Sequence, residues 1–111
     1  MKNHVLFALL LQLLASSGAQ ADSGHRCAAD AIQRAKALLV FHAGTEADVG
    51  VEDSFKLLAP LRNPVNRQQF FDVLQVQGHV YRASFQMRLL YARVPGTCVL
   101  VGQEIIERSS L

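Results

Sequence analysis

The sequence predicts an α+β fold: an N-terminal helix packed on an antiparallel meander of three to four strands, with one disulfide. Three observations support this prediction. Apolar residues recur at helical spacing after Cys27, and they alternate with polar residues over 80–92. The chain also holds two cysteines, Cys27 and Cys98. Together these patterns predict one small domain over residues 22–111.

Residues 1–21 have the pattern of a cleavable secretory signal peptide. Lys2 precedes an apolar run over 5–14 that only Gln12 interrupts, which is signal-peptide length. The tripeptide Ala-Gln-Ala at 19–21 places small side chains where a signal peptidase needs them. An uncleaved membrane anchor is the alternative, but it would require about twenty apolar residues. We expect a periplasmic or secreted protein with no membrane span after cleavage.

The charge balance of the chain excludes one class of partner. Eleven Lys and Arg less Lys2 leave ten in the part after residue 21, against nine Asp and Glu. A nearly neutral domain is not expected to bind nucleic acid.

The two cysteines would share an oxidising compartment, so one intramolecular disulfide is predicted. It would close a loop of about seventy residues, for which chain entropy gives roughly 4 kcal/mol of stabilisation. Two buried free thiols or an exposed redox pair are the alternatives, although the chain lacks the C-x-x-C spacing of redox pairs.

A helix is predicted over 25–43. Ser23 or Asp22 can cap its start, and Gly44 is a typical residue after a helix end. The apolar positions with helical spacing are Cys27, Ala28, Ala31, Ile32, Ala35, Leu38 and Leu39.

The middle of the chain carries weaker patterns. Residues 44–53 mix glycines and acids without a period and are expected to form an exposed loop. The sequence leaves open whether 55–61 is a strand, and Pro60 would restrict such a strand to a sheet edge.

The last third predicts a meander with strands over 69–77, 79–93 and 98–107. Gln77-Gly78 and Pro95-Gly96 have turn composition. Two-residue turns at these dipeptides would place Leu74 opposite Tyr81, Phe70 opposite Phe85 and Leu100 opposite Tyr91. Cys98 would then share the helix-covered face with Tyr91, in agreement with a disulfide to the helix. A one-residue bulge would reverse this argument.

The segment Leu74-Gln75-Val76-Gln77-Gly78 is similar to the Gln-x-Val-x-Gly motif of cystatins, with Leu74 in place of the leading Gln. The helix-on-sheet plan also resembles that of cystatin-like proteins. The resemblance covers five residues, and no inhibitory residue is transferred on it.

The same register predicts that the sheet face away from the helix is rich in large apolar side chains. Such a face is expected to be covered, either by 55–68 or a bulged last strand, or by a protein partner, a second copy or an apolar ligand. The candidate binding face comprises Phe71, Val73, Val80, Arg82, Arg88, Leu90, Val99, Val101 and Ile105.

Catalytic and metal-binding patterns are weak, and no cofactor is expected. Glu104 is predicted opposite Met87 on the helix-covered face, without a second carboxylate beside it. The acids of 44–53 lack EF-hand spacing, and the histidines after residue 21 lack the i, i+4 pairing of helical zinc sites.

We therefore expect a small exported, non-enzymatic binding or interaction protein that acts through a sheet face or edge, with a protein partner or as a homodimer. An inhibitor of an envelope or secreted enzyme is one form of this function. A carrier of a small apolar ligand is the main alternative. A small hydrolase is a weaker one, because it would need Glu104 or a histidine coupled to a partner group.

Overall fold

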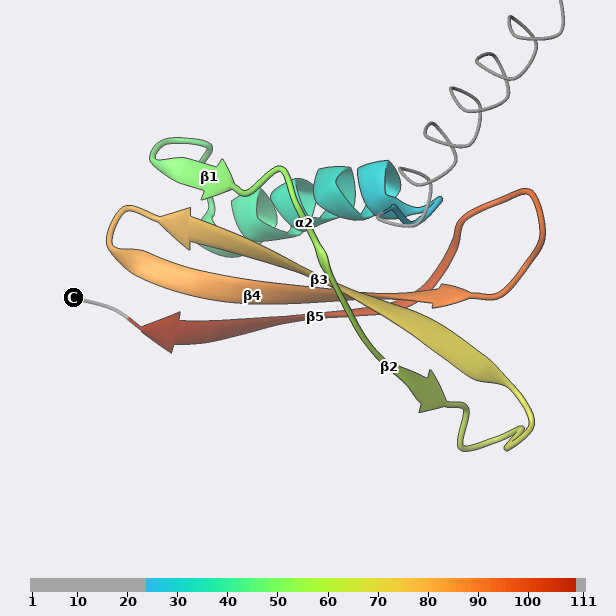
Figure 1. Ribbon diagram of the computed structural model, residues 1–111. Coiled ribbons are helices and arrows are strands. Elements are labelled where there is room, and N and C mark those ends of the chain that lie inside the picture. The colour runs from blue at the N-terminus through green and yellow to red at the C-terminus, as the bar shows by residue number, and fades with distance from the viewer. Residues whose placement is uncertain (1–23, 110–111) are drawn as a thin grey trace, which may run out of the picture.

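The computed structural model describes residues 24–109, which form one helix packed on a five-stranded antiparallel sheet (Figure 1). The predicted signal peptide therefore lies outside the described residues. The predicted α+β class with one disulfide is confirmed, with one strand more than the upper prediction. The elements are α2 (Ala28–Ala43), β1 (Val49–Val51), β2 (Lys56–Arg62), β3 (Phe70–Val80), β4 (Ala83–Ala92) and β5 (Val99–Ser109).

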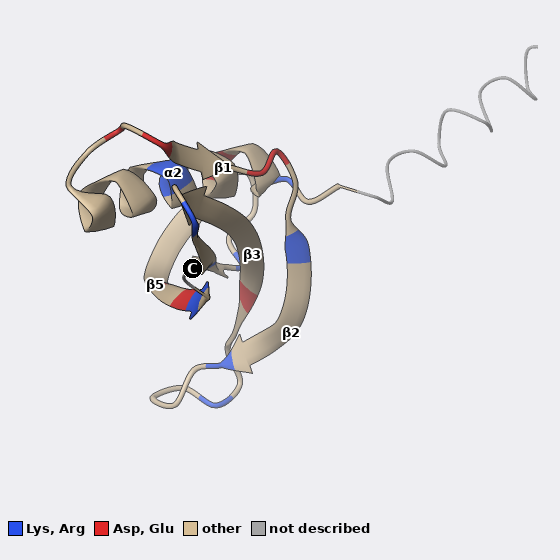
Figure 2. Ribbon diagram, turned by 90° about the vertical axis from the view of Figure 1, so that its left-hand side faces the viewer, with Lys and Arg blue, Asp and Glu red and all other residues tan. Residues whose placement is uncertain are grey.

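Strand β3 organises the sheet. On one side it pairs with β4, which in turn pairs with β5. On its other side it pairs with two short strands in succession, β1 along 78–80 and β2 along 70–75. The strands curve beneath α2 and β1, and Lys and Arg are scattered over the elements in this view (Figure 2). Strands β2 and β5 are consequently the two long edges of the sheet.

Helix α2 covers one face of the sheet because its small and apolar residues recur every four positions. Ala31, Ala35 and Leu39 are fully buried. Gly44 ends the helix in the left-handed region with φ of 78°, and its N–H donates to the carbonyl of Val40. Cys27 occupies the N-cap position. The helix therefore begins three residues later than predicted, and the predicted caps at 22–23 lie outside the described residues.

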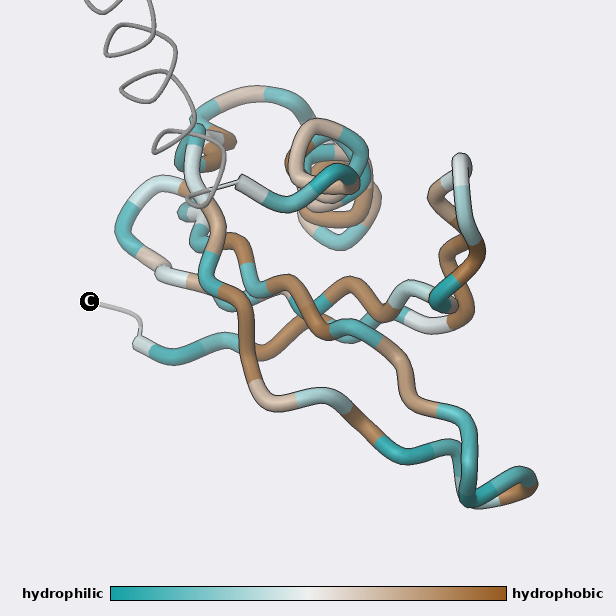
Figure 3. The backbone as a smooth tube through the Cα atoms, turned by 45° about the vertical axis from the view of Figure 1, so that its right-hand side comes forward, coloured by the Kyte–Doolittle hydropathy of each residue, from teal (hydrophilic) through white to brown (hydrophobic). Residues whose placement is uncertain are grey.

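The core lies between α2 and the sheet, where apolar segments of the strands run beneath the helix (Figure 3). Tyr91 is 1% exposed, and its hydroxyl donates to Asp30 at 2.6 Å. The Cys27–Cys98 disulfide joins the start of α2 to the start of β5, with 5.7 Å between the Cα atoms. Both cysteines are used in this bond, which excludes the free-thiol alternative.

The prediction of a loop over 44–53 is wrong at β1. Val49–Val51 pairs with β3, and Gly50 lies directly opposite His79. A Cβ at Gly50 would come within 2.3 Å of the His79 ring, so any other residue here would require that exposed ring to move. Three residues are too few for a strand to show its period, and this is why the pattern did not reveal β1.

The predicted turn at Gln77-Gly78 is also wrong. The β3–β4 turn lies at Tyr81-Arg82, so that Leu74 faces Leu89 and not Tyr81. Likewise Phe70 does not face Phe85, whose partner is Gly78. Gly78 serves close packing in mid-strand: a Cβ there would lie 2.8 Å from Leu39 Cδ2 and 2.9 Å from Met87 Cε.

A bulge in β5 changes the predicted register of the second hairpin. Leu100 faces Tyr91 as predicted, but the pairing shifts by one residue immediately afterwards. Glu104 consequently faces Arg88, and the prediction that it lies opposite Met87 on the helix-covered face is wrong. A single extra residue reverses the face of every side chain that follows it.

Candidate functional site

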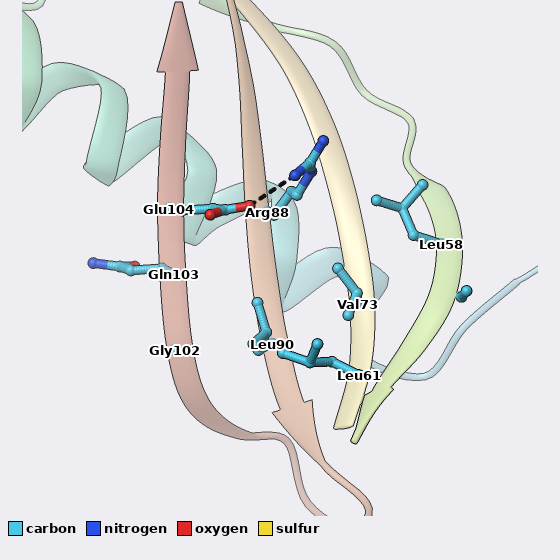
Figure 4. Close-up of a pocket in the computed structure, with 9 residues that line it drawn as sticks. Leu58, Leu61, Val73, Arg88, Leu90, Gly102, Gln103 and Glu104 are labelled. Atoms are coloured by element: carbon cyan, nitrogen blue, oxygen red, sulfur yellow. Dashed lines mark hydrogen bonds and ion pairs between the residues drawn. The ribbon is translucent and has the colours of Figure 1, made fainter. Parts of the chain in front are cut away.

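The candidate site is an open hollow on the outer face of the sheet, the face away from α2 (Figure 4). Its volume is about 480 Å³. Strands β3, β4 and β5 and the bulged part of β2 border it. The lining residues are Leu58, Ala59, Leu61, Val73, Arg88, Leu90, Gly102, Gln103 and Glu104.

The apolar part of the hollow comes from β2, β3 and β4. Val73 and Leu90 face each other across β3 and β4 and form its floor. Val73 is only 6% exposed although no helix covers this face. Leu58 and Leu61 of β2 border it on one side (Figure 4). The 55–68 segment therefore extends the sheet through β2 and places two leucines beside Val73.

The bulge of β2 shapes this wall. Leu58 pairs with Val73 and Leu61 pairs with Phe71, so that Ala59 and Pro60 lie opposite the single residue Asp72. Proline has no N–H to donate to a ladder, which is why β2 leaves regular pairing here. Both leucines can then project on the outer side, and Leu61 is 49% exposed.

Gly102 opens the opposite wall. A Cβ at this position would meet Leu90 Cδ2 at 3.6 Å, an ordinary contact distance. Glycine here is therefore not required by packing, and its missing side chain leaves Leu90 accessible from the β5 side.

The polar end of the hollow is a chain of three side chains. Arg88 Nε donates to Gln75 Oε1 at 3.1 Å. Arg88 Nη1 donates to Glu104 Oε1 at 2.9 Å, as the dashed line in Figure 4 marks. Gln75 is 8% exposed, whereas the Arg88 and Glu104 side chains are 33% and 50% exposed. A pair with this exposure contributes about 0.2–1 kcal/mol, so it orients the arginine more than it stabilises the fold.

The structure brings together only part of the predicted binding face. Val73, Arg88 and Leu90 line the hollow, and Phe71 and Val99 lie on the same face because each pairs with Ala92. Val101 is exposed at the β5 bulge.

The other three predicted residues lie elsewhere. Val80 and Ile105 pack against the helix-side core, because the true register of each hairpin reverses their face. Arg82 is in the β3–β4 turn, with its guanidinium 5.4 Å from the Tyr81 ring centroid. The sequence did not identify Leu58, Leu61 and Gly102 as site residues. The apolar residues of 55–61 were the signal that could have identified the two leucines.

A second polar cluster ties the start of the helix to the sheet. His25 Nδ1 accepts the backbone N–H of Cys27 at 3.0 Å, and Nε2 lies 3.0 Å from Asp72 Oδ2. Nδ1 acts as an acceptor, so the ring proton is on Nε2 and points at Asp72. Both ring nitrogens are thus occupied, which makes His25 a structural link and a poor general base.

Two carboxylates on the helix side have lowered pKa values. Burial acts to raise the pKa of Asp72, but hydrogen bonds from His25 and Arg93 outweigh it and hold that pKa below the usual range. For Asp30, the hydrogen bond from Tyr91 is the main cause of a lowered pKa, against a smaller opposing effect of burial. Burial, followed by the hydrogen bond to Asp30, raises the pKa of Tyr91. These groups are arranged to hold the helix on the sheet.

Within residues 24–109, no three His, Cys, Asp or Glu side chains are grouped in a way that could hold a metal ion. In the same range no helix has the length and apolarity needed to cross a bilayer.

The cystatin-like segment lies inside β3, where residues 74–78 all pair with β4, and Leu74, Gln75 and Gly78 also pair with β2 or β1. It therefore does not form the hairpin predicted from its sequence. Comparisons with protein families, with curated proteins and with solved structures found no match to this chain.

Proposed function

We propose that this chain is a small exported, non-enzymatic binding protein whose outer-face hollow receives an apolar side chain of an extended protein segment. The observation that carries the proposal is the composition of the hollow. An apolar floor of Val73 and Leu90 lies beside the hydrogen-bonding groups of Arg88 and Glu104. An extended peptide can match both parts of the hollow. One of its apolar side chains can contact the apolar floor, and its backbone carries hydrogen-bond donors and acceptors for the polar end.

A carrier of an apolar ligand between helix and sheet is supported less well. That space is filled by fully buried side chains, among them Leu39, Leu74 and Met87. Gly78 has no room even for a methyl group beside Leu39 and Met87. An apolar ligand would thus have to use a surface hollow that is open to water, which would leave part of such a ligand exposed.

Export is part of the proposal and rests on two features. The sequence of residues 1–21 has signal-peptide composition. The Cys27–Cys98 disulfide is typical of proteins in oxidising compartments. Intact mass of the protein isolated from its producing cell tests cleavage after Ala21, since retention of residues 1–21 would contradict it.

Site-specific photo-cross-linking in the producing cell tests the binding role. A photoreactive amino acid at Leu61, at the edge of the hollow, should give an adduct with one defined protein. The matched control is Tyr81, which is 71% exposed but lies in the β3–β4 turn outside the hollow. The adduct from Leu61 should disappear when Leu90→Asp is added, because a carboxylate then occupies the apolar floor.

The outcomes separate the candidate functions. Circular dichroism and an intact disulfide must first show that the Leu90→Asp variant is folded. Equal labelling from Leu61 and Tyr81, or no adduct from Leu61, contradicts the proposal. If native mass spectrometry instead detects a small apolar molecule bound to the purified protein, and Leu90→Asp removes that molecule, the carrier function replaces the peptide-binding proposal.

A further inference from the structure

The two long edges of the sheet are protected to different degrees. On one side, β2 carries Pro60 and a bulge, with Lys56 and Arg62 at its ends, and β1 has only three residues. These features are typical of edges that do not pair with other chains. On the other side, β5 has eleven residues without proline and pairs regularly with β4 over 102–107, between bulges at Val101 and Arg108. Among the described residues no strand lies beside its outer edge. Strand β5 is thus the edge open to a further strand.

On the helix side of the sheet, α2 also leaves β5 uncovered. Helix α2 packs on β1, β3 and β4, and a groove of about 410 Å³ separates it from β5. Phe41 lines this groove together with Leu38 and Gln103, yet it is 86% exposed. Phe41 thus presents apolar surface beside the unpaired edge.

We infer that β5 pairs with β5 of a second copy of this chain, antiparallel and about a twofold axis at Ile106. The inference goes beyond the proposed function, because it assigns a second surface that does not require a ligand in the hollow. The paired sheets would form one ten-stranded sheet with both hollows on the same face.

Symmetry and charge together select Ile106 as the centre. Directly opposed residues in an antiparallel pair share a face, so a twofold axis perpendicular to the sheet places one residue of β5 opposite itself. An axis at Glu104 or Glu107 would bring two like charges together, which destabilises pairing. An axis at Ile106 places Glu104 of each copy opposite Arg108 of the other. No other residue of β5 taken as the centre pairs an acid with a base.

Both charged groups are available for this contact. Glu104 accepts the Arg88 hydrogen bond through Oε1, which leaves Oε2 for a second donor. Glu107 pairs with Phe85 and Ser109 pairs with Ser84, so Arg108 is a bulge residue without a partner on β4. Its long side chain is exposed at the free edge. Because Glu104 also lines the hollow, Arg108 of the second copy would add a positive charge to the rim of that hollow.

Cysteine cross-linking tests the register directly. The native cysteines are joined to each other, so an introduced cysteine is the only free thiol among residues 24–109. Ile106→Cys should form a disulfide-linked dimer under mild oxidation. Glu104→Cys is the matched control: it is more exposed, but its two copies would lie four residues apart along the strands, about 14 Å at 3.4 Å per residue.

Charge exchange tests the same contact in solution. Light scattering should give the unmodified protein a molar mass of two chains. Arg108→Glu should weaken the dimer about tenfold or more, because two attractions become two repulsions. The double variant Glu104→Arg/Arg108→Glu should recover most of this loss, and circular dichroism checks that each variant is folded.

A monomer at high micromolar concentration overturns the inference, as does cross-linking of Glu104→Cys in preference to Ile106→Cys. Either result leaves the photo-cross-linking test of the hollow unaffected, so the two proposals fail separately.

Discussion

Loss of the Cys27–Cys98 disulfide should remove a large part of the stability of the domain. The bond spans 71 residues, and the chain-entropy relation then gives about 4 kcal/mol at 25 °C. A domain of this length has a typical unfolding free energy of about 4–13 kcal/mol. We therefore expect the double variant Cys27→Ala/Cys98→Ala to be partly or wholly unfolded at 37 °C.

Urea denaturation followed by circular dichroism measures this effect. The slope of the unfolding free energy against urea should increase, because an uncross-linked unfolded chain exposes more surface. Cys27 is fully buried, so alanine also removes packing. The unmodified protein reduced with a thiol keeps both sulfur atoms and separates the two contributions. A loss below about 1 kcal/mol in the reduced protein, with an unchanged slope, would refute the chain-entropy reasoning.

Three further predictions concern the helix–sheet interface. Gly78→Ala should destabilise by about 1–3 kcal/mol in urea denaturation because its methyl would overlap Leu39 and Met87; Gly102→Ala is the control and should change stability little. Tyr91→Phe should cost about 1.5–3 kcal/mol through loss of the hydrogen bond to Asp30, and an unchanged denaturation midpoint would exclude this bond as a stabilising one. The pKa values of Asp30 and Asp72 are lowered in the folded state, so their contribution is complete above the unfolded value near 3.8 and is lost as pH falls through the lower folded values. Thermal unfolding from pH 6 to pH 2 should show this loss, and Asp72→Asn should flatten it.

The elements that the sequence predicted best are those with a sustained period. Helix α2 shows its buried positions Ala31, Ala35 and Leu39 at a spacing of four, and β4 alternates over its whole length. The disulfide followed from the number of cysteines and the inferred compartment. The fold class and the disulfide were therefore accessible without coordinates.

The strand register could not be predicted, because two local features, a closely packed glycine and a β-bulge, leave little trace in a sequence. Gly78 has the composition of a turn residue but serves close packing, while the real turn uses Tyr81 with φ of 55°, which is unusual for a bulky residue. The bulge of β5 carries no residue signature, yet it moved Glu104 to the outer face and Ile105 to the core.

The candidate site was predicted in part for the same reasons. Val73, Arg88 and Leu90 were placed on the outer face by alternation within their strands, and the structure gathers them in one hollow. Leu58 and Leu61 join them only because β2 bulges at Pro60. Whether such residues reach the site depends on how their strand bends, and the alternation of apolar and polar residues does not encode that bend.

The separation of the two cysteines has a consequence for the time order of folding. A chain is made from its N-terminus, so Cys27 must wait for 71 further residues before its partner is present. Until then the start of α2 keeps a free thiol, although β1, β3 and β4, on which the helix packs, all precede Cys98 in the sequence. The disulfide can thus fix a helix whose partner strands are already made, and any product that stops before Cys98 keeps a free thiol at Cys27.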